Sequence, residues 1–562
     1  MTGSTEQCAA RKSKQEVIQI KTFYTNAVVY PGKGMPPADS FLVESGRFTF
    51  VGKLKDAAGI VDSCDEVVDL HGAFVCAGFN DSHMHLLSFG QMLDSAGLAE
   101  HTDSLAGMLD YLRAYAEEKQ PSPGEWIIGR GWNQDFFSDE HRLPSRCDLD
   151  KVSTTHPVLI NRACGHCLVV NSEAIRLMGL TTETPCPDGG RIGIEDGEPD
   201  GRLYDNAMQL AWDHVPLPDK DKLKSMIRAA CRALNACGIT SVQTDDYCVW
   251  RNLPWEMVND AFRALEESGE LTVRVYEQAN FTSPEDLTDF LAMGNSTGTG
   301  TDLFRIGPLK MLGDGSLGAR TAFLSVPYAD KPDTRGIPVF SQELLDGMID
   351  LAVKNGMQVA VHTIGDACLD SVLSAYEKAF DECRKHGGHP EDLRCGIVHC
   401  QITRPDQLKK IADMRLHVYA QSIFLDYDIR IVRARVGNAL ADTSYSWKTL
   451  MDMGVRVSNG TDCPVEKPDA VNGIQCAVTR RTLDGTGPYL LDEAFTVSEA
   501  IDSYTSAGAY ASFDETEKGM IAPGMLADFV VLERDPFKTS PDKLKDIRIA
   551  KTYLGGKRVY PE

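Results

Sequence analysis

The chain has 562 residues, 43% of them apolar, and a formal net charge of −24. It is longer than one ordinary domain, with enough apolar material for a sizeable core. Its acidity and the lack of a basic stripe disfavour nucleic acid as a partner. The sequence has no run of about 20 apolar residues, so we do not expect a membrane span. The sixteen cysteines are scattered, which favours reduced thiols and a cytoplasmic protein over a disulfide scaffold.

The two ends of the chain differ in character from its middle. Residues 1–16 are polar and lack the apolar stretch of a secretion signal, so they predict a flexible tail. Short β-like runs fill 17–76 and 513–562, with Glu44-Ser-Gly46 as a turn between two of them. Since neither end can bury an apolar face alone, we expect both to form one small β-sandwich domain.

A first buried strand is expected at 77–85, in a stretch that ends in His83-Met84-His85. Side chains alternate faces along a strand, so His83 and His85 point the same way and can hold one metal ion. A pair of this kind on a half-buried strand is also common as a plain polar stripe. Whether this pair binds a metal therefore depends on whether other strands place further ligand-type side chains near it.

A long segment, about 100–220, separates the first strand from the next. It is too long for one connection and predicts an inserted subdomain. Because it leaves from the C-terminal end of the first strand, it would stand over the metal site and act as a lid or a specificity wall.

Strand-like runs continue through the rest of the chain and alternate with helical stretches. Including the first, we predict eight strands, at 77–85, 239–246, 271–279, 304–312, 357–364, 394–400, 416–423 and 455–462. Eight strand and helix repeats over 77–512 predict a (β/α)8 TIM barrel, whose active site lies at the C-terminal ends of the strands. Lys310, His362, His399 and Asp462 fall near such ends.

The order His-x-His, Lys, His, His, Asp on strands 1, 4, 5, 6 and 8 resembles the metal-dependent amidohydrolase superfamily. Three motifs are similar to its YtcJ-like, amidohydrolase-3 branch, which includes N-substituted formamide deformylases. They are Lys310-Met-Leu-Gly-Asp-Gly-Ser-Leu-Gly-Ala-Arg-Thr321, His362-Thr-Ile-Gly-Asp366 and Gly460-Thr-Asp-Cys-Pro-Val465. The similarity runs from about Val17 to Val559.

The resemblance implies a centre of two zinc ions with the ligands His83, His85, Lys310, His362, His399 and Asp462. The histidines of the first strand and Asp462 would hold one ion, His362 and His399 the other, and a carboxylated Lys310 would bridge them. If Lys310 is an unmodified, salt-bridged lysine, one ion is expected. A hydroxide between the ions would be the nucleophile, with Asp462 passing its proton to the leaving amine.

Other residues have roles that the resemblance leaves open. Similar motifs in the branch face the pocket at Trp132 and His166, but Trp132 also suits the core of the insertion and His166 a structural histidine. Arg320 could recognise a substrate carboxylate or brace its loop through an ion pair. Asp366 would orient a ligand histidine. The branch usually has Glu where this chain has Val398, which we expect to face the helices, opposite to His399.

The predicted function is hydrolysis of a C–N amide bond in a small N-acyl, N-formyl or cyclic amide, and esters or lactones suit the same chemistry. Deamination of a heterocycle is the nearest alternative, but such relatives place Glu three residues after the strand-5 histidine, where this chain has Gly365. An inactive regulatory scaffold is a third reading, which the complete ligand set disfavours. We expect no nucleic-acid or membrane partner, and a homodimer is an open possibility.

Overall fold

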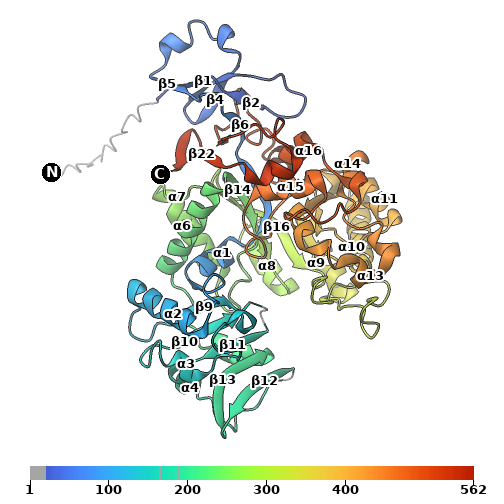
Figure 1. Cartoon of the computed structure of the whole chain (residues 1–562). Coiled ribbons are helices and arrows are strands. Elements are labelled where there is room, and N and C mark those ends of the chain that lie inside the picture. The colour runs from blue at the N-terminus through green and yellow to red at the C-terminus, as the bar shows by residue number, and fades with distance from the viewer. Residues whose placement is uncertain (1–19, 164–165, 188, 562) are drawn as a thin grey trace, which may run out of the picture.

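The structure is a computed structural model that describes residues 20–163, 166–187 and 189–561. A central barrel separates two other parts: β-sheets with strands from the beginning and the end of the chain on one side, and the insertion on the other (Figure 1). The expected tail at 1–16 lies outside the described residues.

Eight parallel strands form the barrel in chain order. They are β7 (Phe79–Met84), β14 (Ile239–Thr244), β15 (Arg274–Asn280), β16 (Phe304–Leu312), β17 (Val359–Thr363), β18 (Gly396–His399), β19 (His417–Ala420) and β20 (Val457–Asn459). Just after β20, the Asp462 N–H donates to the His83 carbonyl at 2.8 Å, so the last strand lies beside the first and the barrel is nearly closed. The eight predicted strands and the TIM barrel are confirmed.

Helices cover the outside of the barrel and bury one apolar face against the strands. The main ones are α6 (Lys220–Ala236), α7 (Trp255–Glu267), α8 (Pro284–Ala292), α9 (Gln342–Lys354), α10 (Asp366–Lys385), α11 (Pro405–Asp413), α14 (Trp447–Asp452), α15 (Ala470–Thr479) and α16 (Val497–Ser503). The short helix α17 (Ser506–Ala511) instead packs Ala511 with Ala360, Val398 and Tyr419 of the barrel strands. Several begin at a side-chain cap, such as Asp219 on the Lys222 N–H and Ser341 on the Leu344 N–H. This packed shell holds the strand ends, and therefore the side chains on them, in fixed positions.

Two further sheets carry strands from both ends of the chain. One has the order β4-β3-β1-β5 and the other β2-β6-β21-β22-β23. Their bounds are β1 (Thr22–Thr25), β2 (Val28–Val29), β3 (Ser40–Glu44), β4 (Arg47–Gly52), β5 (Glu66–Asp69), β6 (Phe74–Ala77), β21 (Phe529–Leu532), β22 (Ile549–Leu554) and β23 (Lys557–Tyr560). Tyr24 stacks on Phe41 at 4.8 Å and meets the edge of Phe529 at 5.3 Å. The two ends thus share one core, while the domain limits 17–76 and 513–562 stay a prediction.

The insertion contains a six-stranded mixed sheet in the order β12-β13-β11-β10-β9-β8. Its main elements are β8 (Ala96–Gly97), α2 (Leu105–Lys119), β9 (Ile127–Trp132), α3 (Arg146–Leu149), β10 (Val158–Arg162), β11 (Cys167–Val170), α4 (Ser172–Met178), β12 (Gly190–Glu195), β13 (Glu198–Asp205) and α5 (Gln209–Trp212). Two separate apolar clusters pack in it. A cavity of about 880 Å³ lies between this subdomain and the loop after β14.

None of the helices in the described part of the chain combines the length and the apolar character that a membrane span requires.

Candidate metal centre

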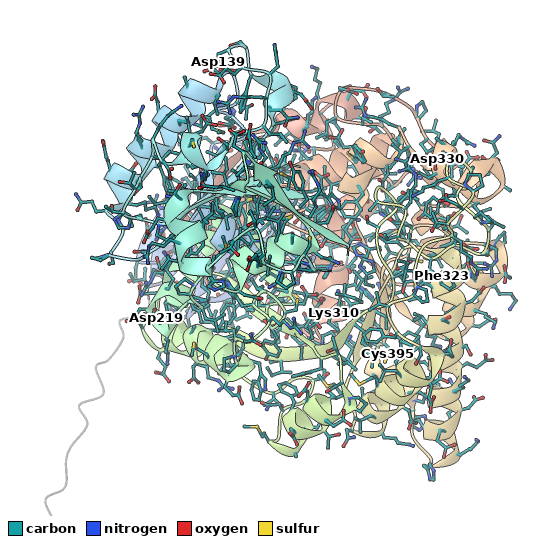
Figure 2. The ribbon with its side chains drawn as sticks, turned by 90° about the horizontal axis from the view of Figure 1, so that it is seen from below. Asp139, Asp219, Lys310, Phe323, Asp330 and Cys395 are labelled. Atoms are coloured by element: carbon teal, nitrogen blue, oxygen red, sulfur yellow. The ribbon has the colours of Figure 1, made fainter. Side chains whose placement is uncertain are left out.

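Ligand-type side chains from five strand ends meet inside one end of the barrel. Figure 2 looks from the side of the insertion and shows Lys310 near the middle of the view. Lys310 is fully buried, and His83 and His399 are each 1% exposed. The imidazole rings of His83 and His399 lie close together, with 5.6 Å between their centroids. A barrel of this type carries its reactive groups at this end.

His83, His85 and Asp462 form a compact donor group. The Asp462 Oδ1 atom lies 2.9 Å from Nε2 of His85 and 3.4 Å from Nε2 of His83. One ligand atom from each residue falls within 4.8 Å of the others, and in the described part of the chain no further trio of His, Cys, Asp or Glu does so. Asp462 adopts a left-handed backbone with φ of 57°, which is unusual for a non-glycine residue. Strained backbone of this kind is concentrated at functional sites.

A second group lies beside the first. Nε2 of His399 is 2.9 Å from Nδ1 of His362, and their ring centroids are 4.4 Å apart. The Lys310 ammonium donates to Oδ2 of Asp245 at 3.2 Å, and Oδ1 of the same carboxylate contacts Nδ1 of His85. Asp245 therefore links the lysine to the first group. All six predicted ligands are brought together, with Lys310 paired to a carboxylate.

Two glutamines fix the protonation of the buried histidines. The Gln278 amide donates to the Ser82 carbonyl at 3.3 Å, which turns its Oε1 toward Nδ1 of His83 at 2.9 Å. Gln421 likewise turns its Oε1 toward Nδ1 of His399, at 2.7 Å. Since an amide oxygen only accepts, each imidazole donates from Nδ1 and keeps a lone pair on Nε2. Both rings thus present a metal-ligating nitrogen to the centre.

Burial keeps these histidines neutral. It lowers the pKa of His83 to about 3 and that of His362 to about 4, and the nearby Lys310 charge adds to both effects. His85 is the exception: burial disfavours its charged form, but the carboxylates of Asp245 and Asp462 outweigh burial and raise its pKa well above the usual value. The pKa of Asp462, which burial would raise, is instead held below its usual value by its contact with His85.

The donor set suits a divalent cation such as zinc. A neutral His362 has one N–H, and its Nε2 lies 3.3 Å from the Gly315 carbonyl. When it donates there, Nδ1 of His362 and Nε2 of His399 present lone pairs to each other at 2.9 Å, as two ligands of one cation do. In the other group, His85 takes up a proton between two buried carboxylates, a position where positive charge is favoured. Imidazole nitrogens and carboxylate oxygens are the usual ligands of catalytic zinc.

The sequence did not single out four of the residues that support this centre. Asp245, Gln278 and Gln421 contact predicted ligands directly, and Asp314 accepts the N–H groups of Ile364 and Gly365 in the loop after His362. Asp245 lies at the C-terminal end of the second predicted strand, 239–246, and directly follows β14, so its position at a strand end was a usable signal. The glutamines carry no such signal, because amides are not metal ligands of choice.

The structure does not bring Trp132 or His166 to the centre. Trp132 is fully buried in an apolar cluster of the insertion, with Leu112 and Ile160 among its members. His166 has a side chain 70% exposed and lies 3.0 Å from Oδ1 of Asp205 within the insertion. These positions match the structural readings of both residues, and we do not include either in the proposed site.

Arg320 and Asp366 also lie in other networks. Arg320 binds the Asp330 carboxylate through Nε at 3.1 Å and Nη2 at 2.8 Å, so it braces the loop after β16. Asp366 is fully buried, accepts the Ser325 N–H at 2.9 Å and pairs with Arg404. Neither residue contacts a ligand histidine; the supporting acids that approach one are Asp245, which contacts Nδ1 of His85, and Asp314, 3.6 Å from Nε2 of His362.

Val398 faces the inside of the barrel, so the expectation that it faces the helices was wrong. It pairs with His362 and Tyr419 on the neighbouring strands and packs with Ala360 in an interior cluster. The strand alternation ends at His399, whose φ of 73° turns its side chain into the barrel as well. Two consecutive residues thus point the same way.

Comparisons with known proteins agree with this geometry. A family model described as "Amidohydrolase family" matches residues 66–560. The putative amidohydrolase YtcJ of Bacillus subtilis is 33% identical, with 93% of this chain and 96% of that protein covered. The N-substituted formamide deformylase of Arthrobacter pascens is 27% identical, over 92% of this chain and 94% of that protein. The protein LONG AFTER FAR-RED 3 of Arabidopsis thaliana is 29% identical, over 96% and 91%.

Solved structures show the same architecture. An uncharacterized metal-dependent hydrolase from Pyrococcus horikoshii superposes with a TM-score of 0.77 and 28% identity, covering 93% of this chain and 99% of that one. A second one, from Pyrococcus furiosus, gives 0.76 and 28%, over 92% and 100%. The match in sequence and in fold extends over nearly the whole chain and confirms the resemblance drawn from the motifs: this chain belongs to the amidohydrolase family.

Proposed function

We propose that this protein is a metal-dependent hydrolase that cleaves the C–N bond of a small N-acyl, N-formyl or cyclic amide. The observation that supports this proposal is the convergence of His83, His85 and Asp462 with the His362 and His399 pair at the C-terminal end of the barrel. The name of the Arthrobacter relative, a formamide deformylase, favours the same class of bond.

In this proposal the centre would take two zinc ions. His83, His85 and Asp462 would hold one ion, and the pair of histidines on β17 and β18 would hold the other. Lys310, fully buried and 3.2 Å from Asp245, would become a further ligand once its amine has added carbon dioxide and lost a proton. Zinc supplies Lewis acidity toward the substrate carbonyl and makes water acidic enough to attack at neutral pH.

The protein's own groups then orient the reaction and move the proton. Gln278 and Gln421 keep the imidazoles of β7 and β18 in the ligating tautomer, so no proton competes for Nε2. The Asp462 carboxylate faces the centre and is kept ionised beside His85. It accepts the proton of the attacking water and delivers it to the leaving amine nitrogen.

Gly365 argues against deaminase-like chemistry. A Cβ atom at this position would lie 2.1 Å from the Phe323 carbonyl oxygen, so no side chain fits there without a shift of the backbone. A glutamate three residues after His362, which deaminases of this fold would need, is therefore sterically excluded by the loop after β16. Amide hydrolysis needs no carboxylate at that place.

The test combines metal analysis with a substrate panel. We expect about two zinc ions per chain and turnover of at least one N-acyl, N-formyl or cyclic amide by the zinc-loaded protein. Asp462→Asn should lose turnover by about 1000-fold or more while most of the zinc stays bound. Asp413→Asn, a change of the same chemistry at an exposed ion pair with Lys409, is the matched control and should keep wild-type rates. Near-normal turnover by Asp462→Asn would refute the proton-transfer role, and a protein that binds no zinc would refute the hydrolase.

A further inference from the structure

A cavity of about 180 Å³ opens beside the metal centre. Loops that follow the five strands β16 to β20 line it, so it lies at the catalytic end of the barrel. Phe424 in its wall stacks on the His399 ring with centroids 5.8 Å apart, and the Val465 N–H, from another wall, donates to the Asp462 carbonyl at 2.8 Å. Whatever fills this cavity lies next to the metal ligands.

Two carboxylates line the cavity without a cationic partner. Asp428 is 8% exposed, and its Oδ2 accepts from the Tyr445 hydroxyl at 2.8 Å and from the Gln401 amide at 3.2 Å. Within the described residues no donor reaches its Oδ1. Glu466 is half-buried and makes no hydrogen bond or ion pair with any residue that the structure describes. Two acceptor groups therefore remain open to a ligand.

The Gln401 side chain supplies a third and independent acceptor. It is 1% exposed and lines the cavity. Its amide nitrogen faces the Asp428 carboxylate, which fixes the orientation of the amide, and its Oε1 has no hydrogen-bond partner in the described part of the chain. A buried acceptor without a donor is unfavourable, so this oxygen is suited to a ligand that donates.

No lysine or arginine lines this cavity, and its other walls include Leu317, Ile364 and Phe424. Arg430, two residues after Asp428, binds Asp484, and Arg480 binds the carbonyls of Tyr445 and Tyr489. Burial without compensating positive charge raises the pKa of Glu466 to about 7 and that of Asp428 to about 6. A ligand that carries positive charge would stabilise the ionised form of both carboxylates.

We propose that this cavity binds a protonated amine on the substrate, so that the preferred amides are cationic ones. The inference rests on the proposed hydrolase function and names its substrate class. An ammonium group offers three donors, which matches the Asp428, Glu466 and Gln401 acceptors. At about 30 Å³ for each water, the cavity has room for roughly six waters, which is enough for a short aminoalkyl group.

The first test compares two formamides of nearly equal shape. N-formyl-1,5-diaminopentane ends in an ammonium group, and N-hexylformamide ends in a methyl group at the same place. We expect the zinc-loaded protein to prefer the cationic compound by about 10- to 100-fold in kcat/KM, the range for charge-assisted hydrogen bonds. Asp428→Asn and Glu466→Gln should each reduce this preference, chiefly through KM, while Asp413→Asn should leave it unchanged. A preference for the neutral compound, or one that both variants retain, would overturn the proposal.

The second test does not depend on turnover. Calorimetry measures the binding of pentylammonium chloride and of 1-pentanol to the zinc-loaded protein. Saturable binding of pentylammonium that is at least about tenfold weaker in Asp428→Asn supports the proposal, whereas no binding, or equal binding of the alcohol, overturns it. If no amide of the panel is hydrolysed, the proposed function fails, and the calorimetric result still decides whether the cavity is a cation site.

Discussion

Asp428→Asn should stabilise the folded protein at alkaline pH even though it weakens the proposed cation site. Asparagine keeps an oxygen where Asp428 Oδ2 accepts from Tyr445 and Gln401, and it replaces only the open Oδ1 by an amide nitrogen. The substitution thus removes a buried negative charge with little change of shape. An aspartate with a purely structural role would give the opposite result, because its loss would weaken the fold.

The magnitude follows from the pKa of Asp428. Burial raises it from 3.8 to about 6, although the hydrogen bonds from Tyr445 and Gln401 oppose the rise. Since the folded state holds this proton more tightly than the unfolded state, stability falls as the pH rises from about 4 to about 6 and stays low above that. A rise of this size corresponds to about 3 kcal/mol of lost stability at pH 8, at about 1.36 kcal/mol for each pKa unit. At pH 5 the same relation leaves about half of that loss.

Thermal unfolding of the wild type and the variant at pH 5 and pH 8 measures this difference. With an unfolding entropy of about 2.1 cal/mol/K per residue, 3 kcal/mol corresponds to a gain of roughly 2 to 3 °C in Tm at pH 8. The gain should shrink to about half at pH 5, and Asp413→Asn should show no such pattern. A variant less stable than the wild type at pH 8, or a difference independent of pH, would show that Asp428 is not held as a buried, uncompensated charge.

Three further predictions concern the supports of the site. Chelation by EDTA should abolish turnover, and added zinc should restore it; activity that survives in metal-free protein would contradict the hydrolase. Gln278→Leu should weaken zinc binding by about 10- to 100-fold, measured by competition with a chromophoric chelator, because the His83 ring loses its orienting acceptor. Arg404→Ala should lower the free energy of unfolding in urea by about 3 kcal/mol, because it leaves the buried Asp366 charge unpaired. An unchanged urea midpoint would contradict that reading of Asp366.

The fold was predictable because the barrel strands are short, apolar and regularly separated by helices. Both faces of such strands are buried, so their sequence differs sharply from that of the helices around them. His362 and His399 interrupt apolar runs at their C-terminal ends, where a barrel must place its reactive groups, and His83 lies at the same end of a more polar strand. The fold and the candidate residues at strand ends therefore came from the same pattern, whereas the ligand set was implied by the resemblance to the amidohydrolase superfamily.

The rest depended on contacts between loops that are far apart in the sequence. Gln401 and Asp428 look like ordinary polar residues after a strand, and only the packing of five loops makes them neighbours. Trp132 lies in a motif similar to those that face a pocket, but the insertion sheet turns its ring into its own core. The inward orientation of Val398 required knowledge of the backbone at His399, which the alternation rule does not contain.

Charge balance links the number of metal ions to the state of Lys310. When a metal ion replaces the proton of His85, all four histidines are neutral while Asp245 and Asp462 are ionised. One divalent ion beside an unmodified Lys310 ammonium then leaves a net charge of about +1, by addition of formal charges. Carboxylation changes the lysine from +1 to −1, and a second divalent ion restores the same total. The second ion and the carboxylated lysine should therefore appear together or not at all.

This linkage is testable with metal-free protein reloaded with zinc. In buffer depleted of carbon dioxide we expect about one ion per chain, and with added bicarbonate about two, while the same ionic strength of chloride should have no effect. Lys310→Met, which cannot be carboxylated, should bind at most one ion under either condition. Two ions bound without bicarbonate, or two ions in Lys310→Met, would show that the buried carboxylates and imidazoles hold a dinuclear centre without a bridging lysine. The Lys310 ammonium and the Asp245 carboxylate, 3.2 Å apart, would then form an ion pair with a structural role only.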